Sequence, residues 1–257
     1  MKIKKIIIIL TSILLFLFLI LFIINISNNS NSKENLENKN NKKITFALTS
    51  CGRPDLLEQT MDSFLKMNTY PIEKYIITED STIEGINNTL IQKYNYLNIE
   101  WIINKTRLGQ IKSIDNMYSK IDTEYIFHCE EDWLFTNKSF IEKSLVILEK
   151  NPKIIQVWLR DQSDTNGHPI EAYSDDFDLL ELGYKSYNNI WNGFSFNPGL
   201  KRLYDYKLIV SYGNIGHEPE ISIKYNDLGY RAAILKTKYV VHIGDERHVE
   251  DVKVKKQ

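Results

Sequence analysis

Apolar segments of strand length alternate with amphipathic segments of helix length across residues 43–150, and this alternation constrains the fold more than any other feature. Strands are predicted at residues 43–49, 75–78, 99–103 and 125–127, and helices near residues 54–65, 86–94, 110–121 and 140–148. Consecutive strands joined by a helix run parallel, because the crossover returns the chain to the same end of the sheet. The sequence therefore predicts an α/β fold with a mostly parallel, Rossmann-like sheet flanked by helices on both faces.

Several ligand classes lose support from the sequence. No Gly-x-Gly-x-x-Gly segment follows the first predicted strand and no Walker-type loop occurs, which disfavours dinucleotide-binding and P-loop proteins. The net charge is −1 and no dense Lys/Arg block lies within the predicted domain, so nucleic acid is not an expected partner. After Trp158 the pattern loosens into a loop-rich stretch over residues 160–199, and such loops usually contact the substrate.

The N-terminus carries a pattern of its own. Three lysines, Lys2, Lys4 and Lys5, precede an apolar run over residues 6–26, which is about the 20 residues that a helix needs to cross a bilayer. A cleaved signal peptide is the alternative, but its apolar region usually has only about 7–15 residues and ends in small residues. We therefore predict an uncleaved signal anchor over residues 1–26. Because basic residues stay on the cytoplasmic side, the N-terminus is expected in the cytoplasm and the remaining chain outside it or in a lumen.

The composition changes twice after the predicted anchor. Residues 27–43 are almost wholly Asn, Ser, Lys and Glu, which cannot bury apolar surface and predict a flexible stalk. Residues 44–257 form the predicted folded domain, and a hydrophobic content of 43% over the whole chain is enough to build its core.

Two cysteines, Cys51 and Cys129, lie at the predicted carboxyl ends of the first and fourth strands. Neighbouring strands are about 4.8 Å apart, so distance does not exclude a disulfide between them. Two cysteines do not make a disulfide framework, however, and two free thiols are the favoured interpretation.

Three adjacent carboxylates, Glu130, Glu131 and Asp132, follow the fourth predicted strand. They repel one another, and burying them unpaired is costly. Ligands of open α/β sheets bind at the carboxyl ends of the strands, so a cation at this edge would neutralise the acids. A short run of oxygen ligands favours Mg²⁺ or Mn²⁺ over zinc. The alternative is a solvated, acid-rich loop without a ligand.

A series of short motifs extends this pattern from Ile44 to Gly244. They are TSCGRPDLL at residues 49–57, EDS at 79–81, RLGQ at 107–110, EED at 130–132, EPEISIK at 218–224 and VHIG at 241–244. In this order the chain resembles glycosyltransferases of the GT-A fold, closest to the family-2-like group of the nucleotide-diphospho-sugar transferase superfamily. Each motif alone is short and degenerate, and their joint order carries the resemblance.

The resemblance implies roles for individual residues. It implies that the nucleotide-sugar donor, a UDP- or GDP-sugar, is bound by Thr49, Ser50, Arg53, Asp80, Arg107, Gly109 and Glu130. It implies a Mn²⁺ or Mg²⁺ site formed by Asp132, Glu130 and His242, in which Glu130 replaces the first acid of the family's Asp-x-Asp motif. It implies Glu218 as the catalytic base, with Glu220 as the second candidate.

The implied reaction is a metal-dependent transfer of a sugar to a hydroxyl of a glycan, protein or lipid acceptor, with inversion, by an enzyme held to the membrane through residues 6–26. The chemistry is consistent with these residue types. Charge builds on the leaving diphosphate, where a cation stabilises it, and a carboxylate accepts the proton of the attacking hydroxyl.

Two other functions remain open, and each key residue has a structural alternative. A sugar-nucleotide nucleotidylyltransferase has a similar fold, but it would need a Gly-rich, basic first loop, and SCGR at residues 50–53 is poor in both respects. A catalytically inactive, glycan-binding member of the fold is the other alternative. Asp80 can cap a turn, His242 can be a hydrogen-bonded core histidine, and Glu218 can be a charge at a helix N-terminus.

Overall fold

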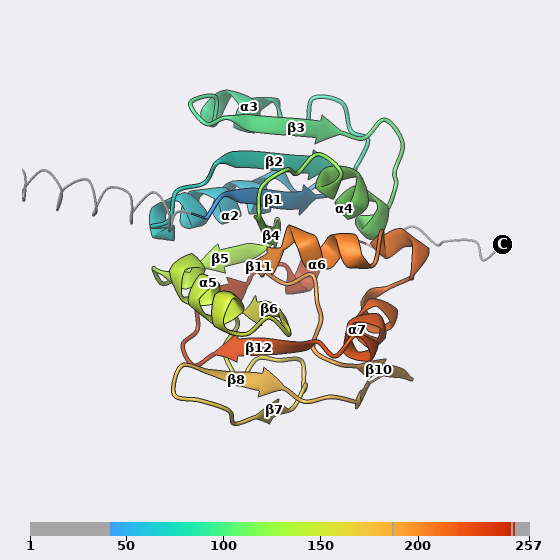
Figure 1. Ribbon diagram of the computed structural model, residues 1–257. Helices are drawn as coiled ribbons and strands as arrows, with labels where there is room; N and C mark the ends of the chain where they lie inside the picture. Colours follow the sequence, from blue (N-terminus) through green and yellow to red (C-terminus); the bar gives the residue numbers. More distant parts are fainter. Residues whose placement is uncertain (1–41, 187, 248, 250–257) are drawn as a thin grey trace, which may run out of the picture. The chain divides into compact units, whose positions relative to one another are not determined.

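The computed structural model describes residues 42–186, 188–247 and 249 (Figure 1). The chain divides into two compact units, Met1–Lys42 and Lys43–Gln257, and the fold below is that of the second unit. The predicted anchor and nearly all of the predicted stalk lie outside the described residues. Within the described part of the chain, no helix is both long and apolar enough to span a bilayer.

The centre of the fold is a sheet for which the described residues supply nine strands, in the order β3-β2-β1-β4-β11-β6-β12-β8-β7. These strands are β1 (Ile44–Ser50), β2 (Lys74–Glu79), β3 (Ile99–Ile103), β4 (Tyr125–Glu130), β6 (Ile154–Trp158), β7 (Ile170–Glu171), β8 (Phe177–Leu180), β11 (Gly199–Arg202) and β12 (Arg231–Leu235). The four predicted strands became β1 to β4 and are parallel to one another, which confirms the predicted parallel sheet. β11 is antiparallel to both of its neighbours, β4 and β6.

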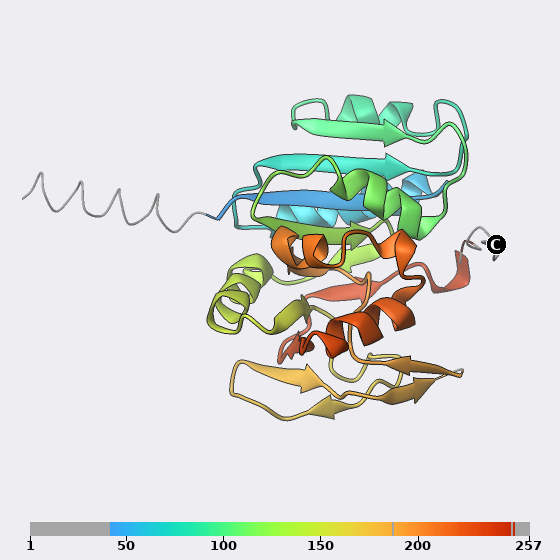
Figure 2. The same ribbon diagram turned by 45° about the vertical axis from the view of Figure 1, so that its right-hand side comes forward.

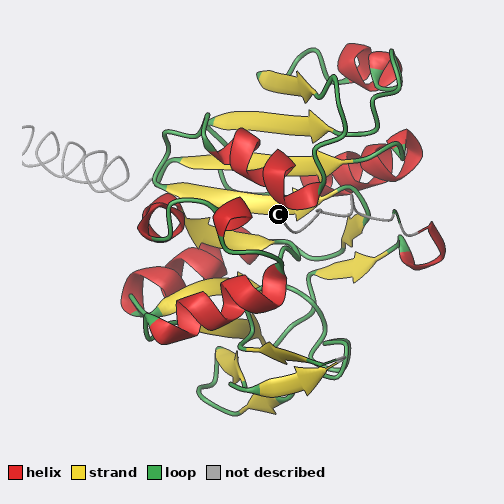
Figure 3. Ribbon diagram, turned by 90° about the vertical axis from the view of Figure 1, so that its right-hand side faces the viewer, coloured by secondary structure: helices red, strands yellow, loops and turns green. Residues whose placement is uncertain are grey.

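Helices cover both faces of this sheet, as predicted (Figure 3). They are α2 (Pro54–Met67), α3 (Asn88–Lys93), α4 (Gln110–Tyr118), α5 (Phe140–Lys150), α6 (Leu203–Leu208) and α7 (Glu218–Asp227), with 3₁₀ turns at Tyr212–Asn214 and Asp245–Arg247. α2 and α5 share one apolar core with Phe46 and Leu48 of β1, whereas α4, α6 and α7 share another with Ala47. Because side chains alternate along a strand, successive residues of β1 bury themselves in opposite layers.

The stretch predicted as loop-rich also contains short strands. β7 and β8 extend the sheet to the edge opposite β3 (Figure 2), while β9 (Tyr184–Ser186) and β10 (Asn189–Trp191) pair with each other. The second predicted helix is also shorter than residues 86–94, and the third ends before Ile121. Strands of two to four residues are too short for alternation to reveal, which explains why the pattern indicated only loops.

A second small sheet determines the geometry of the site. β5 (Trp133–Phe135) follows the acidic run directly and pairs antiparallel with β13 (Val240–His242) near the end of the described chain. His242 is thereby registered opposite Trp133, next to Asp132. Two segments more than a hundred residues apart in sequence thus meet at the carboxyl end of β4.

Candidate active site

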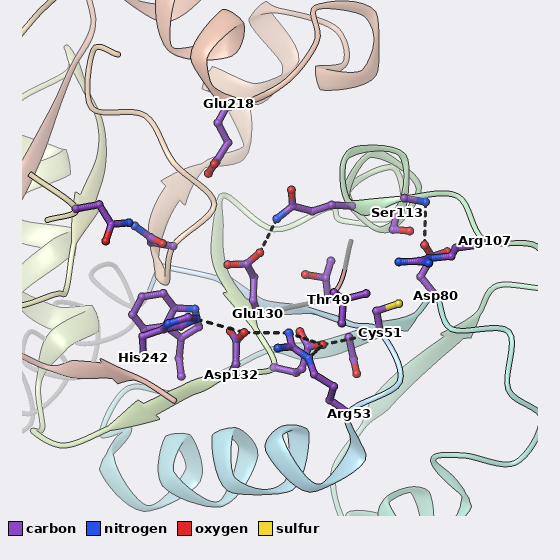
Figure 4. Close-up of a pocket in the computed structure, with 18 of the residues that line it drawn as sticks. Thr49, Cys51, Arg53, Asp80, Arg107, Ser113, Glu130, Asp132, Glu218 and His242 are labelled. Carbon is purple, nitrogen blue, oxygen red and sulfur yellow. Dashed lines mark hydrogen bonds and ion pairs between the residues drawn. The ribbon is translucent and has the colours of Figure 1, made fainter. Parts of the chain in front are cut away.

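A cavity of about 380 Å³ opens at the carboxyl ends of β1, β2 and β4 (Figure 4). Ten of the residues predicted to bind donor, bind metal or act as base line it, namely Thr49, Ser50, Arg53, Asp80, Arg107, Gly109, Glu130, Asp132, Glu218 and His242. This position agrees with the rule that open α/β sheets bind ligands beyond the carboxyl ends of their strands. The structure brings these residues together, and their individual roles remain predictions.

Glu220, the second candidate for the base, does not line this cavity. It is exposed, and its carboxylate accepts a hydrogen bond of 3.1 Å from the backbone N–H of His217. His217 and Glu220 form a reciprocal cap at the start of α7, in which each satisfies a backbone donor of the first helical turn. The structure therefore gives Glu220 a capping function and leaves Glu218 as the acid that faces the cavity.

Asp80 organises the loop that leads into α4. Its carboxylate accepts hydrogen bonds of 2.8 Å from the backbone N–H groups of Leu108 and Gly109 and from the side-chain amide of Asn104. Gly109 has a φ of 84°, a backbone conformation that residues with a side chain rarely adopt. Asp80 thus holds the loop after β3, rather than the turn that follows it directly, which the sequence offered as its structural alternative.

The middle acid of the run, Glu131, has a role that the sequence did not indicate. One of its carboxylate oxygens accepts hydrogen bonds of 2.9 Å from the Nε of Arg53 and from the backbone N–H of Cys51. Its backbone carbonyl accepts a bond of 2.6 Å from Thr60 of α2. Burial raises the pKa of Glu131, and the neighbouring Arg53 opposes that rise. Glu131 therefore joins the acidic run to the loop between β1 and α2.

Asp132 is the centre of a small charge cluster. Its Oδ2 lies 2.9 Å from a guanidinium nitrogen of Arg53 and 3.3 Å from the Nε2 of His242. Burial alone would raise the pKa of Asp132, but the hydrogen bond from His242 and the charge of Arg53 outweigh it and hold the pKa below its usual value. A side-chain Cβ at position 244 would lie 2.3 Å from this oxygen, so the chain passes Asp132 only because Gly244 has none.

The donor set of this cluster fits a small divalent cation. No group of three or more His, Cys, Asp or Glu side chains among the described residues is arranged to hold a metal. Mg²⁺ and Mn²⁺ need fewer, because they are commonly bound by one or two protein ligands together with water and substrate phosphates. Asp132 and His242 present two such donors side by side. Glu130 instead accepts a hydrogen bond of 2.5 Å from Gln110, so its predicted role as a metal ligand gains no support from its contacts.

Glu218 is the first residue of α7, and its side chain points into the cavity from the side opposite Asp132 and Arg53 (Figure 4). Its carboxylate accepts a hydrogen bond from the backbone N–H of Phe196. Burial raises the pKa of Glu218, while this hydrogen bond and the positive charge of Lys201 oppose the rise. Glu218 is therefore an acid in the first turn of a helix, as its structural alternative stated, and its carboxylate also faces the cavity, while its role as a base stays a prediction.

Other lining residues were not predicted from the sequence as site residues. They include Trp133, Arg160, Asn166 and Asn197. The Arg160 guanidinium lies 5.2 Å from the Trp133 ring centre and is paired at 2.6 Å with Asp164. The only signal for the last three residues was their position in or next to the irregular stretch 160–199. Cys51 also lines the cavity, and both cysteines are free thiols, as favoured.

Neither protein-family models nor curated proteins match this chain. Many solved structures do resemble it, three of them as follows. A mannosyltransferase, PcManGT from Pyrobaculum calidifontis in complex with GDP-Man and Mn²⁺, superposes with a TM-score of 0.59 at 12% identity over 80% of this chain and 58% of its own. TarS from S. aureus superposes with a TM-score of 0.58 at 13% identity, over 77% of this chain and 36% of its own. Its residues 1–349 in complex with UDP-GlcNAc superpose with a TM-score of 0.55 at 12% identity, over 80% of this chain and 62% of their own.

The chain thus spans less than two thirds of the length of each of these structures. At these identities the likeness concerns the fold, and it agrees with the motif order seen in the sequence. The chain has a GT-A-like glycosyltransferase fold.

Proposed function

We propose that this chain is a glycosyltransferase that moves a sugar from a nucleotide-diphosphate donor to an acceptor hydroxyl, with inversion and with the aid of a divalent cation. One observation carries the proposal: Glu218 and the Asp132–His242 pair face one cavity at the carboxyl ends of a GT-A-like sheet. The structures of similar fold were determined with GDP-Man and Mn²⁺ or with UDP-GlcNAc, and that supports a nucleotide-sugar donor.

The donor would occupy the part of the cavity next to β1, β2 and α4. Thr49, Asp80, Arg107 and Gly109 line this part, and the N-terminus of α4 begins immediately after Gly109. Backbone N–H groups at a helix N-terminus and an arginine are both suited to phosphate oxygens. The hydrogen bonds that Asp80 accepts from Leu108 and Gly109 keep this loop in place for the donor.

Asp132 and His242 would hold the cation. When bound there, a divalent cation neutralises charge on the diphosphate as it leaves. Arg53 forms ion pairs with Glu131 and Asp132, so it compensates part of the negative charge of the acidic run. Gly244 keeps the backbone close to Asp132 and fixes the carboxylate against β13.

Glu218 would act as the base. The acceptor oxygen forms a bond to the anomeric carbon and gives its proton to the Glu218 carboxylate. The bond from that carbon to the phosphate oxygen breaks, and the nucleoside diphosphate leaves with the electron pair. A single displacement of this kind inverts the anomeric configuration. It requires Glu218 to be ionised before the acceptor binds.

The location of the enzyme is part of the proposal. We propose that residues 6–26 anchor the chain in a membrane, with the N-terminus in the cytoplasm and the catalytic domain outside the cytoplasm or in a lumen. The basic residues before the apolar run and the polar composition of residues 27–43 support this orientation. Protease added outside intact membranes, or inside a lumen, should then cleave around residues 28–41, and cleavage only from the cytoplasmic side would contradict this orientation.

The function is tested with the full-length chain in detergent, incubated with UDP-GlcNAc or GDP-mannose and Mn²⁺, with and without EDTA. We expect release of UDP or GDP from at least one donor and loss of that release in EDTA. Tight binding of UDP or GDP without any turnover would instead indicate an inactive, ligand-binding protein. Release of pyrophosphate from a nucleoside triphosphate and a sugar phosphate would indicate a nucleotidylyltransferase.

A further inference from the structure

A lysine lies in the middle of the sheet with its charge buried. Lys201 belongs to β11, where it is paired with Ile126 of β4 on one side and Gln156 of β6 on the other. Only 2% of its surface is exposed, and its ammonium nitrogen has no hydrogen-bond partner among the described residues. The nitrogen lies 5.2 and 5.6 Å from the ring centres of Phe194 and Phe196. Aromatic faces attract a cation but do not replace its hydration.

The neutral polar side chains on the neighbouring strands, His128 and Gln156, do not compensate this charge. Side chains of alternate residues share a face, so Ile126, His128 and Glu130 of β4 point to the same layer as Lys201. Both ring nitrogens of His128 and the amide nitrogen of Gln156 are buried and have no partner among the described residues. Burial, and secondarily the charge of Lys201, lowers the pKa of His128 well below its ordinary value, so His128 stays neutral.

The acidic side chains that act on Lys201 lie at the cavity. Burial lowers the pKa of Lys201 to about 7, and the charges of Glu218 and Glu130 oppose that fall. Burial also raises the pKa of Glu130 to about 8, so below pH 7 Lys201 is mostly charged and Glu218 is its main counter-charge. Lys201 and Glu218 are also joined through Phe196, whose ring faces the ammonium group and whose backbone N–H donates to the Glu218 carboxylate. Phe196 therefore links the buried lysine to the carboxylate that faces the cavity.

Packing alone does not explain a lysine at this position. A methionine or leucine would fill the same space without the cost of removing an ammonium group from water, and such replacements of buried charges are often neutral or stabilising. What an apolar residue would not supply is a positive charge acting on Glu218. Without that charge, burial would favour the protonated form of Glu218, opposed mainly by the hydrogen bond from Phe196.

We propose that Lys201 is a positioning residue for the reaction at this site, whose buried ammonium group keeps the Glu218 carboxylate ionised and therefore able to accept a proton. The proposal rests on the proposed function, in which Glu218 is the base and must be ionised when the acceptor gives up its proton. The other charged groups that act on Glu218 are His217, which precedes α7, and Glu130 of β4.

The test replaces Lys201 with methionine in the full-length chain, with the exposed Lys207→Met as the matched control for loss of a lysine. Glutamate labelled with ¹³C at the carboxyl carbon allows the Glu218 signal to be followed by NMR as the pH changes, and Glu218→Gln identifies that signal. We expect its titration midpoint to rise by about one pH unit in Lys201→Met and to stay unchanged in Lys207→Met. Lys201→Gln serves as a second neutral variant if the methionine chain does not fold.

A rate measurement adds a functional readout. A rise of one unit in this midpoint lowers kcat/KM by about tenfold on the acid limb of the pH profile, and the loss disappears at higher pH, with UDP affinity unchanged. An unchanged Glu218 midpoint in both neutral variants, or a loss of rate that is the same at every pH, would overturn the proposal. The titration needs no turnover. It therefore tests the effect of Lys201 on Glu218 even if the protein turns over no nucleotide sugar and the proposed function fails.

Discussion

The two sides of the cavity hold their charges in different ways. On the β2 side, Glu79 and Asp80 have partners for both carboxylate oxygens, and Glu79 accepts from the backbone N–H groups of Gly52 and Ser81 at 2.9 and 2.8 Å. On the β11–α7 side, Glu218 accepts one backbone N–H and Lys201 has no hydrogen-bond partner among the described residues. The first side is satisfied by the backbone, and the second is held by charge interactions through the protein interior.

This difference separates binding from chemistry. A carboxylate that accepts several backbone N–H groups is held in its position, so it suits a wall that keeps its shape. A carboxylate whose charge depends on a buried lysine changes its proton affinity when one neighbour changes, which suits a group that must take up and release a proton. We therefore expect substitutions on the β11–α7 side to change turnover and substitutions on the β2 side to change stability.

The largest expected effect comes from the pair Glu218→Gln and Glu220→Gln. Glu218→Gln removes the proposed base and keeps the shape of the side chain, so turnover should fall by a factor on the order of 10²–10⁴ with UDP affinity nearly unchanged. Glu220→Gln affects only an exposed cap and should leave turnover within about threefold. Initial rates and calorimetry with UDP measure both. A dead Glu220→Gln with an active Glu218→Gln would reverse the assignment.

Asp132→Asn comes next. It removes the charge of the proposed cation ligand, so turnover with Mn²⁺ should fall by a factor on the order of 10². The free energy of unfolding should fall slightly, because Arg53 and His242 stabilise the ionised form of Asp132. Repulsion among the three acids, taken alone, would predict no change or a gain in stability for this substitution. That stabilisation is present above the ordinary pKa of 3.8 and is lost as the pH falls below it.

The exposed Asp55→Asn, which removes an ion pair with Arg247, is the control for Asp132→Asn. Mn²⁺-dependent rates and chemical unfolding at pH 7 give the two readouts. Equal turnover in the Asp132 and Asp55 variants would remove Asp132 from the proposed cation site.

The regular part of the fold was predictable because each of its helices and strands is long enough to show the spacing of its apolar residues. β1 and the helix after it have a continuous buried run followed by a helical apolar stripe, and Pro54 marks the start of the helix. β9 and β10 have three residues each, too few to distinguish a strand from a loop. The pairing of β13 with β5 joins distant segments and has no local signal in the sequence. The motif around His242 nevertheless placed His242 in the same predicted site as Asp132.

The acids at the strand ends of the site were predictable from the sequence, whereas the buried lysine behind the site was not. Lys201 and Arg202 are adjacent basic residues in a short strand, and alternation says that one points inward without saying which one. Only the tertiary fold places Lys201 against Phe194 and Phe196 and leaves Arg202 to cap the carbonyl groups at the end of α5. Glu131 was missed for the same reason, since its partner Arg53 lies 78 positions away.

On the β2 side, Asp80→Asn should have a larger effect on the free energy of unfolding than on turnover. The amide keeps one acceptor oxygen but turns an NH₂ group toward a backbone N–H of Leu108 or Gly109. Leaving a buried donor unsatisfied costs about 1–3 kcal/mol of the free energy of unfolding. Urea unfolding at pH 7 measures this loss, with the exposed Asp176→Asn as the control. Equal stability in the two variants would contradict a backbone-satisfied wall.

The smallest expected effect is the pH dependence of stability that comes from His168, which lies in the region between β6 and β11. His168 is buried between the rings of Trp158 and Tyr184, and its Nε2 lies 2.8 Å from the carbonyl oxygen of Glu181. Burial lowers its pKa below the ordinary value of 6.5, against the opposing effect of Glu181. Below pH 6.5 the unfolded chain therefore takes up a proton at this histidine more readily than the folded chain does. Stability should fall from pH 6.5 downward until the folded pKa is reached, by up to about 1.4 kcal/mol per pH unit.

His168→Phe removes this titration and also the hydrogen bond to Glu181. At pH 8 the variant should be less stable than the natural chain by about 1 kcal/mol, the usual net value of one hydrogen bond. The gap should narrow between pH 6.5 and pH 5.5, because only the natural chain loses stability through this group. Urea unfolding at the two ends of the range measures it. A gap that stays constant would mean that His168 takes up its proton equally well in the folded and unfolded chain, and that burial in this region imposes no cost on charge.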